Sequence, residues 1–144
     1  FRAYEAELDI DLCFQGFDRE LAELPGAYAA PRGRLLVAEH RSDQTLVGCA
    51  ALRPEPSSTD AGELKRMFVA PAFRGKARLG RRMADALRGA ACDLGYRVLR
   101  LDTLARLEPA VHLYESLGFE RTAPYTENPE PDVLFFEKAL DLIS

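Results

Sequence analysis

A basic loop that contains glycine joins a strand to a helix, and it holds the residues of this sequence best suited to chemistry. The loop follows Pro71, and the apolar repeat of a helix starts at Leu79. The first N–H groups of a helix lack partners within it, and the helix dipole makes that end positive. With basic side chains nearby, such a helix start binds polyanions such as a pyrophosphate. The predicted anion site comprises Arg74, Gly75, Lys76, Ala77, Arg78, Leu79, Gly80 and Arg81.

Composition narrows the class of protein. With 144 residues, 47% of them hydrophobic and 29% charged, the chain is predicted to form one domain over residues 1–144. No apolar run has the length needed to cross a bilayer, so no membrane partner is predicted. The net charge of −4 argues against nucleic acid as a partner, because nucleic-acid binders are usually basic overall. The basic cluster is therefore interpreted as a local feature.

The cysteines Cys13, Cys49 and Cys92 are well separated and include no CxxC pair. This pattern argues against a disulfide framework and against a zinc site, so no metal is predicted. Small buried thiols fit the reducing cytoplasm, and no secretory signal is visible. Because the chain begins at Phe1 rather than Met, its true N-terminus is expected to lie upstream.

Hydrophobic periodicity predicts the elements that position the loop. Helices are indicated near residues 4–12 and 18–24, followed by a loop over 25–33. Strands are indicated at 35–40, 46–52, 63–69 and 98–103, with a flexible connection over 53–62, a strand opening at Phe119 and a last strand over 133–137. Helices start near Leu79 and Pro109, and Gly95 and Gly118 suit their C-terminal caps. Because strand–helix–strand units require a right-handed crossover and a parallel pair, the fold class is α/β, of the mixed α+β kind.

Two separate segments resemble one protein family. ELKRMFVAPAFRG at residues 63–75, with its loop and helix, and AVHLYESLGF at residues 110–119 are similar to two motifs of the GNAT superfamily of N-acetyltransferases. They occur in the family's order and separation, and the likeness covers nearly the whole chain. The resemblance implies a GNAT-like fold, with a mostly antiparallel central sheet, a splayed parallel strand pair, helices on both faces, and a first strand truncated before Phe1. It also implies that acetyl-CoA is the co-substrate.

The sequence departs from the family pattern at two places. Arg74 and Gly80 are one residue further apart than the family loop allows, and Ala77 or Arg78 replaces its middle glycine. Leu107 stands near the position of an asparagine that contacts the cofactor in many members, which implies one polar contact fewer.

Tyr114 and Glu63 are the catalytic candidates that the resemblance implies. The Tyr114 hydroxyl would lie near the thioester sulfur and protonate the departing thiolate, although the helical spacing of Tyr114 also fits a core tyrosine. Glu63 would take the proton of the amine, often through water, although an exposed glutamate at the start of a strand fits equally well. Glu115 and Asp102 are weaker candidates, and the alternation around Asp102 fits a side chain that faces solvent.

The backbone of Met67, Phe68 and Val69 is the other implied part of the site. In the resembling fold this strand end splays from its neighbour, so its N–H groups could hold the oxyanion and pair with the pantetheine amides. A normally paired strand remains the alternative. His40 and His112 are expected to be structural or exposed, because neither has a serine or cysteine partner placed for a triad.

Residues 24–28 and 125–129 are turn-rich and are candidates for the acceptor side, although ordinary connections explain them as well. Nearby, Glu127, Glu130 and Asp132 would suit a cationic amine. The predicted function is transfer of the acetyl group to a small-molecule or peptide primary amine by direct attack in a ternary complex. The alternative is a non-catalytic acyl-CoA-binding or sensor module on the same fold. Exchange of edge strands would allow a homodimer.

Overall fold

The computed structural model of this chain describes residues 28, 32–40, 43, 45–74 and 78–140. The helices expected near residues 4–12 and 18–24 lie outside the described residues. The strands are β1 (Arg34–Glu39), β2 (Leu46–Pro54), β3 (Ala61–Val69), β4 (Val98–Leu104), β5 (Glu120–Arg121) and β6 (Val133–Ala139). The helices are α3 (Leu79–Asp93) and α4 (Glu108–Ser116), and a short 3-10 helix, η3 (Pro71–Phe73), follows β3.

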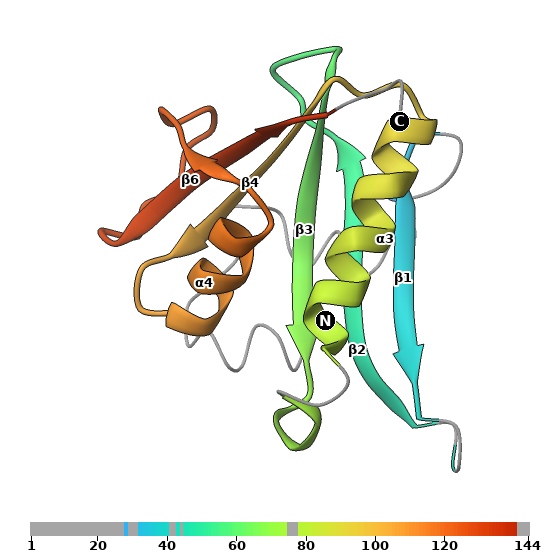
Figure 1. Ribbon diagram of the computed structural model, residues 1–144. Coiled ribbons are helices and arrows are strands. Elements are labelled where there is room, and N and C mark those ends of the chain that lie inside the picture. Colours follow the sequence, from blue (N-terminus) through green and yellow to red (C-terminus); the bar gives the residue numbers. More distant parts are fainter. Residues whose placement is uncertain (1–27, 29–31, 41–42, 44, 75–77, 141–144) are drawn as a thin grey trace.

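The six strands form one mixed sheet in the order β1-β2-β3-β4-β6-β5 (Figure 1). Only the β3–β4 pair is parallel among the pairings of the described strands, and α3 makes the crossover between these two strands. The predicted mixed sheet, mostly antiparallel with one parallel pair, is therefore confirmed.

The parallel pair separates soon after it forms. Its register is Ala61↔Val98, Gly62↔Leu99 and Glu63↔Arg100, whereas β3 continues to Val69 and β4 to Leu104. Figure 1 shows β4 turning away from β3 beyond these positions. The splayed strand pair predicted from the family resemblance is thus present.

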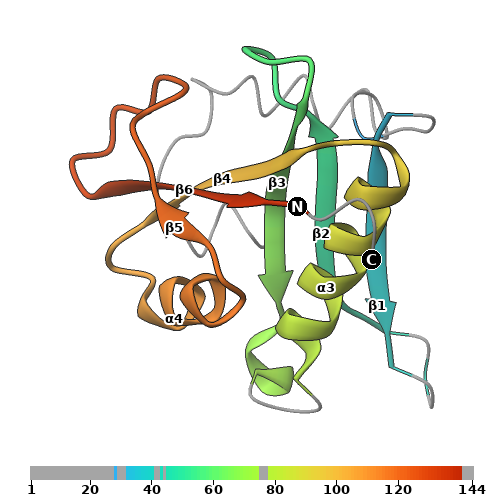
Figure 2. The same cartoon turned by 45° about the horizontal axis from the view of Figure 1, so that its top comes forward.

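The hydrophobic core lies between the sheet and the two described helices. Helix α3 lies over β1, β2 and β3 (Figure 2), and buries Met83 and Leu87 against them. Tyr114 of α4 belongs to the same buried cluster. Gly95 and Gly118 follow the two helices with φ of 85° and 92°, a conformation that favours glycine, which confirms the predicted C-terminal caps.

Two element boundaries differ from the sequence prediction. The segment 53–62 is not a flexible connection, because β2 extends to Pro54, β3 begins at Ala61, and Glu55 in the turn is only 2% exposed. The Glu55 carboxylate accepts hydrogen bonds from the Ser57 N–H and hydroxyl, so a side chain orders a turn whose composition reads as loose. Phe119 is buried, and the strand after it starts at Glu120.

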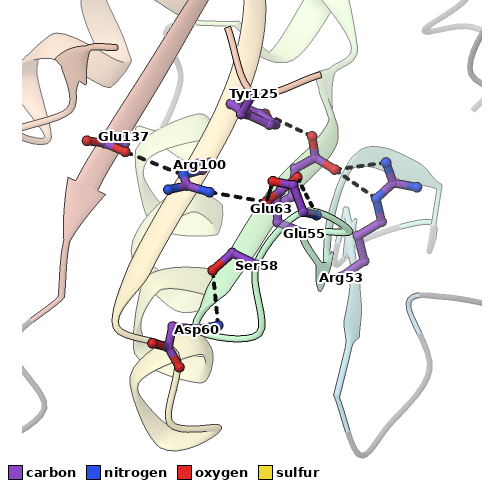
Figure 3. A network of polar contacts seen from close by, with 9 residues as sticks. Arg53, Glu55, Ser58, Asp60, Glu63, Arg100, Tyr125 and Glu137 are labelled. Atoms are coloured by element: carbon purple, nitrogen blue, oxygen red, sulfur yellow. Dashed lines mark hydrogen bonds and ion pairs between the residues drawn. The ribbon is translucent and has the colours of Figure 1, made fainter. Parts of the chain in front are cut away.

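The sheet face opposite the core carries charged side chains in register across four strands. Arg53 pairs with Glu63, Glu63 with Arg100, and Arg100 with Glu137, each as directly opposed residues of neighbouring strands. We refer to Arg53, Glu63, Arg100 and Glu137 as the charge row. Figure 3 shows these side chains together with Glu55 and Tyr125. The last position at which β3 and β4 still pair lies in this row.

Candidate active site

The cleft of this protein lies where β3 and β4 have separated. It is a small hollow that is open to solvent, with a cavity volume of about 50 Å³. Its walls come from β3, from β4 and from the start and inner face of α4. The lining residues are Leu64, Lys65, Arg66, Met67, Asp102, Thr103, Leu107, Ala110 and Tyr114.

A β-bulge shapes the β3 wall of the cleft. The β2–β3 register shifts between Cys49 and Ala51, and Arg66 on the opposite strand has a left-handed φ of 58°. The Cys49 thiol donates a hydrogen bond to the Arg66 carbonyl oxygen at 3.2 Å. A bulge bends its strand and redirects the groups that follow. It therefore turns the backbone of β3 at the point where Met67 enters the cleft wall.

Tyr114 is both a core residue and a cleft residue. Its side chain is 6% exposed and packs edge-on against Phe119, with 5.9 Å between the ring centroids. It also lines the cleft beside Leu107 and Ala110. The two interpretations of its helical spacing are thus not exclusive, because a core ring can present one edge to a cleft.

Glu63 is 1% exposed, so the interpretation of an exposed glutamate at the start of a strand is wrong. Arg53 donates from Nε and approaches with Nη2, each 2.8 Å from Oε1. The Tyr125 hydroxyl donates to Oε2 at 2.8 Å. Burial of a carboxylate is tolerated only when cations and donors surround it, and this is the arrangement here.

Lys65 and Asp102 form a second buried pair in the cleft wall. Their side chains are 5% and 7% exposed, and Lys65 Nζ lies 3.5 Å from Asp102 Oδ1. Asn128 donates to Asp102 Oδ2 at 3.1 Å, so the expectation that Asp102 faces solvent is wrong. Burial lowers the pKa of Lys65, and the Asp102 carboxylate opposes this change only in part. Sequence reasoning missed Lys65, although it lies two residues from Glu63 and therefore on the same face of β3.

The start of α3 follows β3 through η3, as the predicted anion site requires. The first hydrogen bond of the helix joins the Arg82 N–H to the Arg78 carbonyl, and no side chain caps the N-terminus. The N–H groups of residues 79–81 therefore have no acceptor within the helix. Gly80 lies close to both β3 and α4, because a Cβ on it would lie 3.9 Å from Val69 Cγ2 and 3.5 Å from Leu113 Cδ2.

The structure describes only part of the predicted anion site. Gly75, Lys76 and Ala77 lie outside the described residues. Arg78 is exposed and has a left-handed φ of 50° directly before the helix. The Arg74 Nε donates to the Val69 carbonyl at 2.9 Å, and Arg81 donates to the Ser116 hydroxyl at 3.2 Å. Arg74 and Arg81 therefore tie the helix start to β3 and α4.

Most of the weaker candidates lie outside the cleft lining. Glu115, His112 and Glu127 are exposed, and the His40 ring lies 5.4 Å from the Phe73 ring. Arg106 Nη1 lies 3.7 Å from Glu130 and 3.6 Å from Asp132, so these two carboxylates already have a cation. Tyr28, in the turn-rich segment considered for the acceptor side, is 2% exposed.

Among residues 28, 32–40, 43, 45–74 and 78–140, histidine, cysteine and carboxylate side chains form no cluster of three that could hold a metal ion. Within the same part of the chain, no helix has the length and apolar character needed to cross a membrane.

Known proteins are similar to this chain in sequence. A family model described as "Acetyltransferase (GNAT) domain" matches residues 31–121. A protein of Schizosaccharomyces pombe named an uncharacterized N-acetyltransferase is 40% identical over 132 residues, which cover 92% of this chain and 79% of that protein. A protein of Azospirillum brasilense named IAA acetyltransferase is 37% identical over 113 residues, covering 78% of this chain and 71% of that protein.

Solved structures share the fold. An acetyltransferase of Streptococcus agalactiae superposes with a TM-score of 0.75 at 25% identity, covering 94% of this chain and 82% of that one. An acetyltransferase of Salmonella typhimurium, solved with its cofactor acetyl-CoA, has a TM-score of 0.64 at 24% identity, covering 92% of this chain and 75% of that one. From the extent of the family match and the identity to its relatives, this chain belongs to the GNAT family of N-acetyltransferases, acyltransferases that use acetyl-CoA.

Proposed function

We propose that this chain transfers the acetyl group of acetyl-CoA directly to a primary amine while both substrates are bound. The observation that carries the proposal is the separation of β3 from β4 after Glu63↔Arg100, which leaves a cleft bordered by both strands and by Tyr114. The cleft is lined on one side by apolar residues of α4 and on the other by the buried Lys65–Asp102 pair. A cleft with one apolar wall and one charged wall suits the binding of two reactants of different polarity.

The residues present fit coenzyme A. In the described part of the chain, no strand pairs with the β4-facing edge of β3 beyond Glu63, so this edge suits the pantetheine amides. In this proposal the backbone of Met67, Phe68 and Val69 receives them. The start of α3 lies at the end of the same strand and lacks a side-chain cap, which suits a pyrophosphate. The phosphate-binding residues are Arg74, Gly75, Lys76, Ala77, Arg78, Leu79, Gly80 and Arg81.

Three parts of the chain would act on the reacting atoms. Acetyl-CoA supplies the acetyl thioester, and the amine nitrogen bonds to its carbonyl carbon as the C–S bond breaks. Glu63 is 1% exposed and is not among the residues that line the cleft, so it takes the proton that the ammonium must lose through an intervening water. One backbone N–H group of Met67, Phe68 or Val69, directly after the bulge at Arg66, holds the developing oxyanion. Tyr114 donates its hydroxyl proton to the departing sulfur, and the second proton, which the nitrogen loses as the amide forms, restores the Tyr114 hydroxyl.

A turnover assay tests this function directly. Purified protein is incubated with acetyl-CoA and each member of an amine panel comprising amino acids, lysine peptides, polyamines and small metabolites. Release of the CoA thiol is followed together with the mass of the acetylated product. We expect thiol release that depends on one class of amine. Binding of acetyl-CoA by calorimetry without turnover of any amine would contradict the proposal.

A further inference from the structure

We infer that Tyr125 is a positioning residue that holds the Glu63 carboxylate in place for proton transfer. The inference rests on the proposed function, because it takes Glu63 as the proton acceptor. Tyr125 lies in the connection between β5 and β6, and Figure 3 shows its hydroxyl directed at Glu63.

The two oxygens of Glu63 are held by different parts of the fold. Arg53, on the neighbouring strand β2, approaches only Oε1. Oε2 accepts the Tyr125 hydroxyl proton from a residue that is 62 positions away in the chain. A carboxylate fixed through one oxygen can still turn about that contact, whereas donors on both oxygens fix its plane. Tyr125 therefore determines the direction in which the remaining lone pairs of Glu63 point.

The surroundings of Tyr125 keep its hydroxyl a donor. Its ring packs edge-on against Phe135 at 5.4 Å between centroids, and the Arg100 guanidinium lies 5.8 Å from the ring centre. Burial and the nearby Glu63 carboxylate raise the pKa of Tyr125 well above its ordinary value. The hydroxyl thus stays protonated in neutral and mildly alkaline solution, where it can only donate to the ionised carboxylate.

A second contact attaches the same segment to the cleft. Asn128 donates to Asp102 Oδ2 at 3.1 Å, and Asp102 lines the cleft. The Glu130 N–H donates to the Asn128 side-chain oxygen at 3.0 Å, which fixes the amide orientation. Residues 125–130 are therefore tied to two buried carboxylates, Glu63 on β3 and Asp102 on β4. Attachment at two points limits how far Tyr125 can move relative to Glu63.

The test compares two tyrosine variants that each lose one buried hydrogen bond. Tyr125→Phe keeps the ring on Phe135 and removes the donor to Glu63. Tyr96→Phe is the matched control, because the Tyr96 hydroxyl donates to the Arg32 carbonyl at 2.7 Å and its ring belongs to the hydrophobic core rather than to the contacts of Glu63. Both variants are measured for melting temperature and for kcat and KM with acetyl-CoA and the best amine of the panel.

We expect Tyr125→Phe to lower kcat about tenfold, since hydrogen bonds to charged groups are among the stronger ones. The KM for acetyl-CoA should stay unchanged. Tyr96→Phe should lower the melting temperature without changing kcat or KM. In a Glu63→Gln background, Tyr125→Phe should have no additional effect on kcat.

Several results would overturn the inference while leaving the proposed function intact. These are an active wild type with Tyr125→Phe behaving like Tyr96→Phe, a Glu63→Gln variant of full activity, or effects of Glu63→Gln and Tyr125→Phe that multiply. A wild-type protein that binds acetyl-CoA but acetylates no amine would remove the proposed function and the inference together.

Discussion

At the scale of single residues, a substitution of Tyr114 can distinguish a packing role from a catalytic one. Tyr114→Phe keeps the ring against Phe119 and removes only the hydroxyl. If that hydroxyl protonates the sulfur, kcat should fall about 100-fold, which is the lower range of general acid catalysis. Affinity for acetyl-CoA, measured by calorimetry, should be unchanged. An unaltered kcat would assign Tyr114 to the core alone.

Lys65 gives the protein a pH dependence of stability whose sign can be stated. Burial lowers its pKa from the ordinary value of 10.5. Between the lowered pKa of the folded chain and 10.5, the folded chain therefore binds fewer protons at this site than the unfolded chain, and stability rises with pH across this window. Lys65→Met should remove this rise. Unfolding by urea, measured from about pH 7 to about pH 9.5, compares the two slopes.

The upper limit of that range has its own reason. The pKa values of Tyr96 and Tyr125 are raised from 10.0, so the folded chain keeps protons that the unfolded chain loses at higher pH. Stability falls there, which would hide the effect of Lys65. Parallel slopes for wild type and Lys65→Met within the lower range would contradict the assignment.

At the scale of elements, the start of α3 is the feature to test. Replacing Arg74 and Arg78 together by alanine should weaken binding of CoA about tenfold, because two cations near the helix start are lost. A pantetheine fragment without phosphates should lose much less affinity. Arg88→Ala is the control, since Arg88 is an exposed residue of the same helix beside Asp85. Equal losses for CoA and the fragment would argue against phosphate contact.

The same helix shows what sequence can predict. Its bounds followed from the apolar repeat beginning at Leu79 and from Gly95, because both signals are local. The bulge at Arg66 was not predictable, since no glycine or proline marks it and the register of β2 against β3 produces it. The Glu63–Tyr125 contact was also missed, because nothing local relates residues 62 positions apart.

At the scale of the whole molecule, the alternation around Asp102 was interpreted as a sign of a solvent-facing side chain, and the sequence did not show how the polar face of the sheet is made up. Glu63 and Asp102 were open to interpretation as solvent-facing, whereas both are buried among opposite charges. Periodicity reports the difference between faces. It does not report whether a polar face meets water or a partner of opposite charge.

Arg100 tests how much the buried charges support the fold. It lies 3.1 Å from Glu55 and 3.4 Å from Glu137. Arg100→Met would leave Glu55, which is 2% exposed, without this cation, and should cost about 3–5 kcal/mol in the free energy of unfolding. Arg106→Met, at a 46% exposed side chain, should cost less than about 1 kcal/mol. Urea unfolding measures both, and equal costs would contradict this expectation.

The charge row also has a consequence for how the sheet assembles. A slip of one residue in any of its three pairings would move a charged side chain to the face now occupied by Leu52, Leu64 and Leu99. An unpaired charge there costs several kcal/mol, so misaligned sheets are strongly disfavoured during folding. Replacing the whole row by apolar residues could therefore raise stability while allowing neighbouring alignments to compete. The charge row, at which the pairing of β3 with β4 ends, therefore also selects the native register of the strands it crosses.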